Sequence, residues 1–383
     1  MLSRELAYIG HEVTFLTSLP SNRFIFPYKK ELRDGVSIIA FPDIVPNFIR
    51  RTGFGPLGFL FKLFYIFFNS FDIYHSDAGH RPTGGIPVLI KKIFFSSVVY
   101  VCEWWDYFGI GGQFDEKKGI RKYTHGVYDL LFEVNEKKLA DGIVCLSTAM
   151  KARAMKEGIS ESNICVINGG SDVRNIKYMH INKYREKYGI KSSAIVFGFI
   201  GMNVGELNDL IPFIEALNEL SIENKEFSNC ILATTGKLLP EKILVSLKLK
   251  FKIIEFGWVN YNYFSELLSC IDLFVLVQIP NKKNETRWPN KLGDYIAAGR
   301  KTIINLYGET AILGKAHQEL FIPVLFDKES IKTKLIEIFN NGEIYADRQK
   351  IRQIAVEELS WETKSKQLDG FYSKILEQKK NKI

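Results

Sequence analysis

The 383-residue sequence lacks most of the short motifs by which enzyme classes are recognised. It contains no Gly-x-Ser-x-Gly, no Gly-rich loop ending in Lys-Ser/Thr, no Cys-x-x-Cys and no Asp-x-Asp. The first three absences argue against an α/β-hydrolase, a P-loop nucleotide site and a dithiol redox site. The absence of Asp-x-Asp predicts that no obligatory metal ion is needed, and we expect no bound cofactor.

Cysteine is scarce and long apolar runs are missing. The five cysteines lie far apart, mostly inside apolar, strand-like runs, which favours buried free thiols in a reducing compartment over disulfides or zinc ligands. With no leader-like segment, the sequence predicts a cytoplasmic protein. The most apolar run, Pro56 to Phe68, is interrupted by Lys62 and is shorter than the roughly 18 residues that a membrane span needs.

The composition is that of an ordinary globular protein, with 46% hydrophobic and 25% charged residues. Its length suits about two domains. The formal net charge is +8, but the basic residues are scattered and no nucleic-acid motif is present. We therefore expect phosphorylated substrates or an anionic membrane face, and not nucleic acid, as the partner of this charge.

The stretch from Glu285 to Gly299 is the most informative part of the sequence. The pattern predicts a strand over residues 272–277, a polar loop, a helix with Pro289 in its first turn and Gly299 at its end, and another strand over residues 301–306. A helix N-terminus at the carboxyl end of a parallel sheet binds anions. Arg287 and Lys291 flank that position and suit a diphosphate. Glu285 and Asp294 bracket it and suit sugar or ribose hydroxyls, although a solvated amphipathic helix is the structural alternative.

The segment Pro-Asn-Lys-Leu-x-Asp-Tyr-x-Ala-Ala-Gly, which ends at Gly299, resembles the donor-site helix of glycosyltransferase family 4. That family usually has two Glu eight residues apart, the second lying five before the Gly. Asp294 matches the second position, and Glu285 matches the first only approximately. The resemblance implies a retaining enzyme that uses a nucleotide-sugar donor and has the GT-B fold, an α/β fold of two facing Rossmann-like domains with parallel sheets.

The resemblance also predicts the domain boundaries. We expect an N-terminal, acceptor-side domain over residues 1–185, joined by a final helix over 362–383, and a nucleotide-sugar-binding domain over 186–361. The segment that ends in Gly10-His-Glu-Val resembles one that follows the family's first strand, so that strand is expected to be missing from this sequence.

The donor side departs from the family in one place. After the strand predicted over residues 194–201, the family has Gly-Arg and a Lys that hold the diphosphate, whereas this sequence has Met202 to Asp209 without a basic residue. We therefore expect Arg287, Lys291 and the backbone near Asn290 to carry the phosphate. The predicted donor-binding residues are Gly201, Trp258, Val259, Glu285, Arg287, Pro289, Asn290, Lys291, Leu292 and Asp294.

Two polar segments at predicted strand ends form the expected acceptor side. The first holds His75, Asp77, His80 and Arg81, and its alternative is a polar turn in which Asp77 caps a helix. The second is Glu103-Trp104-Trp105-Asp106, in which aromatic faces can stack on sugars and carboxylates can bind hydroxyls. An aromatic cluster at the domain edge is an equally good interpretation. By the family resemblance Glu103, Asp106 and Glu285 are the catalytic candidates.

The predicted function is transfer of a sugar from a nucleotide-sugar donor to a saccharide or lipid-linked saccharide acceptor, as in bacterial surface-polysaccharide synthesis. A nucleotide-sugar epimerase of the same fold and a non-catalytic, degenerate subunit are the alternatives. The apolar segment over residues 48–71 suits peripheral contact with the inner membrane face, but its all-round aromatics favour a core helix.

Overall fold

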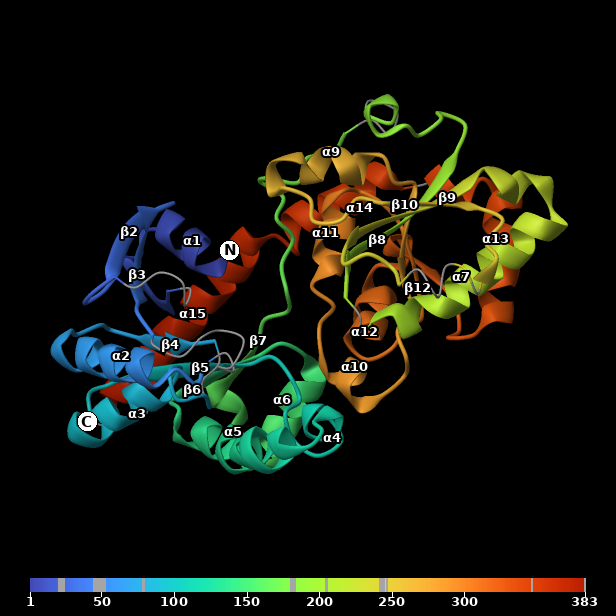
Figure 1. Ribbon diagram of the computed structural model, residues 1–383. Helices are drawn as coiled ribbons and strands as arrows, with labels where there is room; N and C mark the ends of the chain where they lie inside the picture. Colours follow the sequence, from blue (N-terminus) through green and yellow to red (C-terminus); the bar gives the residue numbers. More distant parts are fainter. Residues whose placement is uncertain are drawn as a thin grey trace. The chain divides into compact units, whose positions relative to one another are not determined.

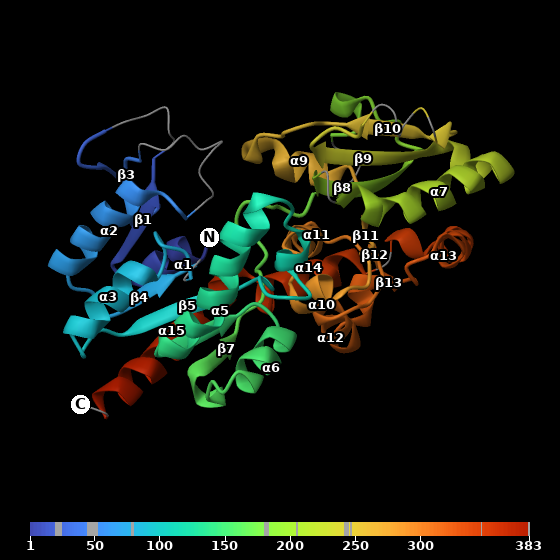
Figure 2. The same cartoon turned by 60° about the horizontal axis from the view of Figure 1, so that its bottom comes forward.

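The computed structural model describes residues 1–19, 25–43, 53–77, 80–179, 184–203, 206–240, 245, 247–345 and 347–381. The chain forms two compact units (Figures 1 and 2). Unit 1 comprises Met1–Asn168, Thr286–Trp288 and Trp361–Ile383, and unit 2 comprises Gly169–Glu285 and Pro289–Ser360. Residues 169–185 thus group with unit 2, and the final helix groups with unit 1.

Unit 1 contains two sheets. In the three-stranded sheet, β1 (Val13–Ser18) runs parallel to β3 (Val36–Phe41), and β2 (Lys29–Arg33) is antiparallel to β3. Asp34 and Gly35, with φ of 51° and 77°, form the two-residue turn of the β2–β3 hairpin. The four-stranded parallel sheet has the order β4 (Tyr74–Ser76), β5 (Tyr100–Trp104), β6 (Gly142–Cys145) and β7 (Ile164–Val166).

The alternation along β5 divides the core of unit 1 into two layers. Tyr100, Cys102 and Trp104 face one side, where they pack with residues of α2 (Pro56–Phe68), α3 (Ile86–Phe94), α5 (Val127–Leu139) and α6 (Thr148–Lys156). Val99 and Val101 face the other side, against α1 (Leu2–Tyr8) and the long α15 (Trp361–Lys380) (Figure 1). A short helix, α4 (Gln113–Glu116), and a π-helical turn, η1 (Lys122–Gly126), precede α5.

Unit 2 is a six-stranded, fully parallel sheet. Its strand order is β10 (Lys252–Glu255), β9 (Cys230–Gly236), β8 (Ile195–Met202), β11 (Leu273–Leu276), β12 (Thr302–Ile304) and β13 (Phe321–Pro323). Leu273 and Val275 face the cluster that includes α7 (Leu207–Glu223) and α13 (Lys328–Asn341), while Phe274 stacks on Tyr295 at 3.8 Å from the opposite side. Further α-helices among the described residues are α9 (Phe264–Ser269), α10 (Lys282–Thr286), α11 (Lys291–Ala297), α12 (Glu309–Ala316) and α14 (Arg348–Glu357).

The order of the predicted strands and helices is confirmed, and the α/β fold is that of two Rossmann-like units. Two helix predictions need correction. The helix predicted with Pro289 in its first turn begins only at Lys291, as α11, and part of the polar loop predicted before it forms the short helix α10. The two helices do not join, because a residue before proline is disfavoured in the α conformation. The apolar helix expected over 48–71 begins only at Pro56, and residues 48–52 lie outside the described part. Within the described residues, no helix has the length and apolar character needed to cross a membrane.

Candidate functional site

Helix α11 occupies the predicted donor position in unit 2. Its C-terminal end is closed as expected: Gly299 has φ 69°, its N–H donates to Ile296 O, and Arg300 N–H donates to Tyr295 O. The backbone N–H of Ile200 donates a hydrogen bond to the Tyr295 hydroxyl at 3.0 Å. This hydrogen bond anchors α11 to the carboxyl end of β8. In parallel α/β sheets this is the edge at which ligands bind.

Lys291 begins α11 and is paired within the protein. Its ammonium lies 3.2 Å from the Glu206 carboxylate and 4.0 Å from the ring centroid of Phe199 on β8. Glu206 lies in the loop after β8 and directly precedes α7. In the resembling family this loop carries the Arg and Lys that hold the diphosphate, whereas here it carries an acid. In this structure the positive charge of Lys291 is therefore balanced by an internal carboxylate.

Asp294 lies one turn further along α11. Partial burial, and then the nearby Asp172 carboxylate, raise the pKa of Asp294 to about 7. Asp172 is 3% exposed and accepts hydrogen bonds from the Tyr261 hydroxyl and from Asn175. Asp294 consequently titrates near neutral pH, which is unusual for a carboxyl group.

The turn that carries Asp172 is held against α11 at close range. A Cβ on Gly293 would lie 2.5 Å from Gly170 O, so only glycine permits this approach without rearrangement. The Ser171 hydroxyl donates to Gly293 O at 2.8 Å. Asp172, Ser171 and Gly293 were not among the predicted site residues, although an Asn-Gly-Gly-Ser-Asp sequence such as that of residues 168–172 is typical of a turn.

The remaining predicted donor residues differ in exposure. Trp258 is 83% exposed in the loop after β10, beside Gly257, whose φ is 60°, and this leaves its indole face open. Val259 is partly buried in the same loop, and Gly201 at the end of β8 is exposed. Leu292, by contrast, is fully buried, so it supports α11 from the core and offers no surface to a ligand.

Arg287 and Lys291, both predicted to flank the diphosphate, do not lie on one helix, because Arg287 precedes α11. Arg287 lies between α10 and α11 and groups with unit 1, where Thr286 O accepts a hydrogen bond from the Ser147 hydroxyl. Glu285, at the end of α10, is exposed. Pro289 is buried and Asn290, which is exposed, is the N-cap residue of α11.

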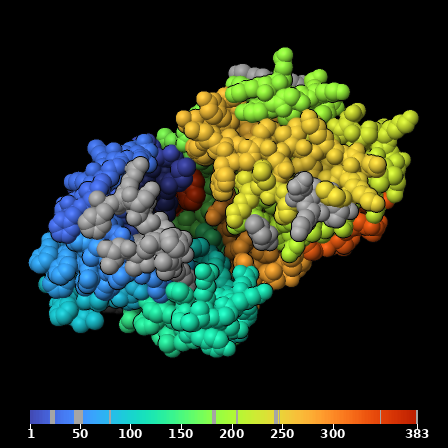
Figure 3. All heavy atoms as spheres, viewed as in Figure 1, coloured from blue at the N-terminus to red at the C-terminus, as the bar shows by residue number. Residues whose placement is uncertain are grey.

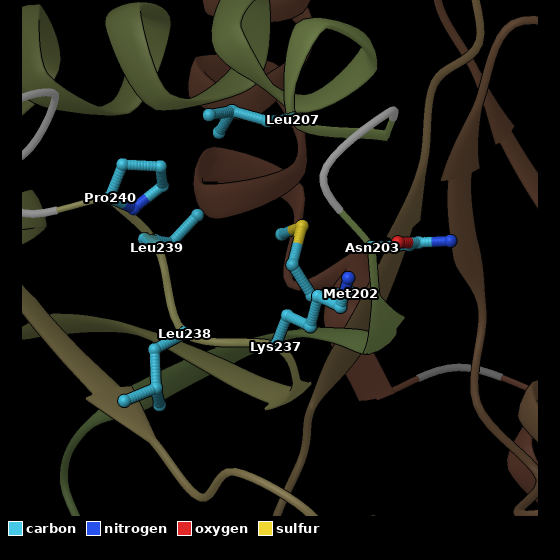
Figure 4. Close-up of a pocket in the computed structure, with 7 residues that line it drawn as sticks. All are labelled: Met202, Asn203, Leu207, Lys237, Leu238, Leu239 and Pro240. Atoms are coloured by element: carbon cyan, nitrogen blue, oxygen red, sulfur yellow. The ribbon is translucent and has the colours of Figure 1, made fainter. Parts of the chain in front are cut away.

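A small pocket lies where β8 and β9 end (Figure 4). Lys237 is exposed directly after β9, and its backbone N–H donates to Met202 O at 2.9 Å. Sequence reasoning missed this lysine because it follows a different strand from the loop that was searched for basic residues. The pocket is lined by Met202, Asn203, Leu207, Lys237, Leu238, Leu239 and Pro240.

In unit 1 the structure brings together two of the predicted residues. His75 at the end of β4 lies with its Nε2 3.3 Å from the Glu103 carboxylate on β5. The other ring nitrogen of His75 hydrogen-bonds to the Tyr372 hydroxyl of α15. Burial, and then the charge of Glu103, raise the pKa of Tyr372, which keeps its hydroxyl protonated. Glu103 is 28% exposed at its side chain, so solvent reaches this pair.

Three other predicted residues of unit 1 have structural contacts instead of open surfaces. Trp104 is 1% exposed and donates from Nε1 to Glu133 at 2.8 Å, so its ring cannot stack on a sugar. His80 is equally buried against Asp129, and burial lowers its pKa. Asp106 is buried and accepts from the backbone N–H of Tyr107 and from Gln113.

The last three predicted residues of unit 1 are Trp105, Asp77 and Arg81, which lie in the loops after β4 and β5. Trp105 donates from its indole to Asp77 O, which joins the loop after β5 to the loop after β4. Asp77 itself is exposed, and the Arg81 guanidinium lies 5.7 Å from the ring centroid of Phe108. Within the described residues, no group of three or more His, Cys, Asp or Glu side chains is arranged to hold a metal ion.

The sequence matches no family model and no curated protein. The structure is similar to sucrose-phosphate synthase from Thermosynechococcus elongatus, with a TM-score of 0.70 and 12% identity over 98% of this chain and 92% of that chain. It is also similar to Anabaena HepE in complex with UDP-glucose, with a TM-score of 0.64 and 13% identity over 89% and 86% of the two chains. The fold is GT-B.

A third structure with this GT-B fold is WaaG, a glycosyltransferase involved in lipopolysaccharide biosynthesis. Its TM-score is 0.63, with 16% identity over 97% of this chain and 94% of that chain. At such identities the likeness establishes the fold, while the chemistry has to be argued from the residues of the site.

Proposed function

We propose that this chain is a glycosyltransferase that moves a sugar from a nucleotide-sugar donor to a hydroxyl group of an acceptor. The observation that carries the proposal is the placement of Lys291 and Asp294 on α11, at the carboxyl edge of the parallel sheet of unit 2. A cation suits the diphosphate of the donor, and a carboxyl suits hydroxyl groups. The GT-B likeness to HepE, whose structure holds UDP-glucose, supports the same assignment.

In this proposal unit 2 binds the donor. Lys291 and Lys237 of unit 2 supply positive charge for the diphosphate, and Arg287, four residues before Lys291 in the chain, adds a further cation. The backbone N–H groups near Pro289 and Asn290 add hydrogen-bond donors. Asp294 accepts or shares hydrogen bonds with sugar or ribose hydroxyls. The open face of Trp258 is suited to stacking on the nucleobase.

Unit 1 then handles the transferred sugar and the acceptor. Glu103 and His75 provide a carboxylate and an imidazole in contact, so a proton leaving the acceptor hydroxyl can be taken up there. By the family resemblance we further propose hexosyl transfer with retention of configuration, in which cationic groups stabilise the leaving diphosphate. The proposed acceptor is a saccharide or a lipid-linked saccharide, in line with WaaG, and the proposed location is cytoplasmic.

A thermal-shift screen against UDP-, GDP- and ADP-sugars, followed by assays of donor hydrolysis, tests the proposal. A ligand that binds only the folded state raises the melting temperature. We expect one class of nucleotide sugar to do so and to release its nucleoside diphosphate slowly in the absence of acceptor. Failure of every nucleotide sugar to raise the melting temperature would contradict donor binding.

The His75–Glu103 contact also favours a second candidate, a nucleotide-sugar epimerase, because that chemistry needs an acid and a base in the site. The two enzymes differ in their products. An epimerase converts the sugar of the donor or releases an epimerised sugar, whereas a transferase releases the unchanged sugar or passes it to an acceptor. A non-catalytic subunit would bind the nucleotide sugar and do neither.

A further inference from the structure

The Tyr372 hydroxyl lies against the imidazole of His75 inside unit 1. Tyr372 is 8% exposed on α15, and its hydroxyl hydrogen-bonds to Nδ1 of His75 on β4. The two rings meet edge to face, with their centroids 5.8 Å apart. Helix α15, red in Figure 3, packs beside the dark-blue α1 on this face of the four-stranded sheet. The two residues are 297 positions apart in the chain, so the packing of α15 on the sheet brings them together.

The direction of this hydrogen bond follows from where the hydroxyl proton can go. A buried tyrosine hydroxyl carries one proton and needs an acceptor for it. Burial, and then the charges of Glu103 and Asp369, raise the pKa of Tyr372, so the proton stays on the oxygen. Within the described part of the chain, His75 Nδ1 is the hydrogen-bonding partner of this hydroxyl, and Asp369 is engaged with His11 at 2.8 Å. The hydroxyl therefore donates and Nδ1 accepts.

This hydrogen bond determines which nitrogen of the His75 ring carries a proton. A neutral imidazole has one protonated and one unprotonated nitrogen, and because Nδ1 accepts from Tyr372, the proton lies on Nε2. Nε2 is buried and forms no hydrogen bond within the described residues, but Glu103 Oε1 lies 3.3 Å away. Catalytic hydrogen bonds are often long or poorly aligned before a ligand binds and tighten afterwards. The Nε2–H is thus placed to donate to the Glu103 carboxylate.

We propose that Tyr372 is a positioning residue that fixes the ring proton of His75 on Nε2, so that His75 holds the Glu103 carboxylate and Glu103 takes up the proton of the acceptor hydroxyl. The proton moves from the acceptor oxygen to a carboxylate oxygen of Glu103, which becomes a carboxylic acid, while His75 stays neutral. His75 is not the base in this arrangement, because Nδ1 is occupied by the Tyr372 hydroxyl and Nε2 already carries a proton. The proton uptake by Glu103 rests on the proposed transferase activity, whereas the tautomer of His75 does not.

Nitrogen NMR of the full chain, labelled with ¹⁵N in its six histidines, tests the tautomer without a substrate. At about pH 8, above the usual titration range of histidine, long-range proton–nitrogen spectra show which ring nitrogen is protonated. The signals that disappear in His75→Gln belong to His75. We expect a protonated Nε2 and an unprotonated Nδ1 in the parent, and both tautomers in Tyr372→Phe. A proton on Nδ1 in the parent, or unchanged His75 signals in Tyr372→Phe, would overturn the proposal.

Tyr74→Phe is the matched control for the loss of a buried tyrosine hydroxyl. Tyr74 directly precedes His75, is 6% exposed and belongs to the core layer on the other face of the sheet, where its hydroxyl donates to Asn69 O at 3.0 Å. We expect Tyr74→Phe to lower the melting temperature and to leave the ring nitrogens of His75 as in the parent. Circular dichroism checks that each variant is folded. An equal change of tautomer in Tyr74→Phe and Tyr372→Phe would overturn the specific role of Tyr372.

Turnover separates the roles of His75 and Glu103. His75→Gln keeps an N–H donor for Glu103 but has no basic nitrogen, whereas His75→Leu has neither. In hydrolysis of the nucleotide sugar found by the thermal-shift screen, with water as the acceptor, we expect kcat to fall only severalfold in His75→Gln. In His75→Leu it should fall about tenfold further, the value of one charge-assisted hydrogen bond.

Two outcomes of these assays would overturn the assignment of proton uptake to Glu103. A loss of about a hundredfold or more in His75→Gln, the size expected when a general base is removed, would assign the proton to His75. A parent chain that neither hydrolyses the nucleotide sugar nor transfers its sugar would remove the Glu103 step together with the proposed function. The tautomer measured without substrate would stand in that second case, so the two failures are distinguishable.

Discussion

The Lys291 ammonium lies 3.2 Å from the Glu206 carboxylate, and this pairing sets the charge that the candidate phosphate site presents. Both side chains are largely buried, with 16% and 24% of their side-chain surfaces exposed, so the ion pair is only weakly screened by solvent. A diphosphate that binds Lys291 must therefore compete with Glu206.

Replacing Glu206 should strengthen binding of the nucleoside diphosphate. In Glu206→Gln the Lys291 ammonium loses this carboxylate as a competitor of the phosphate, and we expect affinity to rise by roughly tenfold, the value of one charge-assisted hydrogen bond. Calorimetry with the nucleoside diphosphate identified by the screen measures the change. Glu215→Gln, at an exposed acid of α7, alters the net charge equally and should leave affinity unchanged. An unaltered affinity in Glu206→Gln would show that the phosphate does not contact Lys291.

Removing both cations should abolish binding of the diphosphate. We expect Arg287→Ala/Lys291→Ala to lose measurable affinity for the nucleoside diphosphate while the weaker binding of the bare nucleoside persists, because only the former needs charged donors when it leaves water. Titration of both ligands into the variant checks this. Parent-like binding of both would exclude α11 as the phosphate site and favour a non-catalytic chain.

Asp294 should make stability and donor binding depend on pH. Its pKa in the folded protein, about 7, exceeds the ordinary value of 3.8, so the folded state holds this proton more tightly. The free energy of unfolding should therefore fall as pH rises from about 4 to 7, by on the order of a few kcal/mol. Denaturant titrations across this range should show a smaller fall in Asp294→Asn, and an identical pH profile would contradict the raised pKa.

A direct test of the same residue uses donor affinity. Asp294→Ala should weaken donor binding by about 1–3 kcal/mol, the range for losing a buried hydrogen-bond partner. Calorimetry at one pH measures the donor affinity of the variant, and its circular dichroism spectrum checks that the variant is folded. Unchanged affinity would remove Asp294 from the donor site.

Glu103 should matter for turnover more than for nucleotide binding. We expect Glu103→Gln to lower kcat by about a hundredfold or more, the lower end of the effect of a general acid or base, while nucleoside diphosphate affinity stays close to that of the parent. Tyr372→Phe, which removes the hydroxyl on the far side of His75, should have a smaller effect on kcat. A loss of nucleotide affinity in Glu103→Gln would instead assign Glu103 to the donor-binding site.

Gly293 should tolerate no side chain. In Gly293→Ala the new Cβ would lie 2.5 Å from Gly170 O, so the turn that carries Asp172 must move, at a cost of about 1–3 kcal/mol. Gly370→Ala is the matched control, because its Cβ meets nothing within 4 Å in the middle of α15 and should stabilise by about 0.5–1 kcal/mol. Chemical denaturation measures both, and equal stabilities would contradict the close approach.

Much of the fold follows from local patterns in the sequence. Gly299 predicted the end of α11, because the residue there needs a positive φ that few residues adopt. For the same reason an Asp-Gly pair such as Asp34-Gly35 is typical of a two-residue hairpin turn. The buried state of Trp104 also follows from the sequence, since β5 alternates and Trp104 shares a face with Tyr100 and Cys102. The separation of α10 from α11 at Trp288 and Pro289 is local as well, because a residue before proline is disfavoured in the α conformation.

The sequence by itself determined the order of strands and helices, the turn residues and the polar segments at strand ends. Only the tertiary structure decided which of those segments meet. The Lys291–Glu206 pair, the approach of Asp172 to Asp294 and the His75–Glu103 contact all join residues that are far apart in the chain. Such contacts depend on which strand ends are neighbours and on how closely the backbones of two elements approach each other. They also depend on the rotation of each helix about its axis, which buried ion pairs set in α5. No local periodicity encodes these relationships, because they arise from packing between elements.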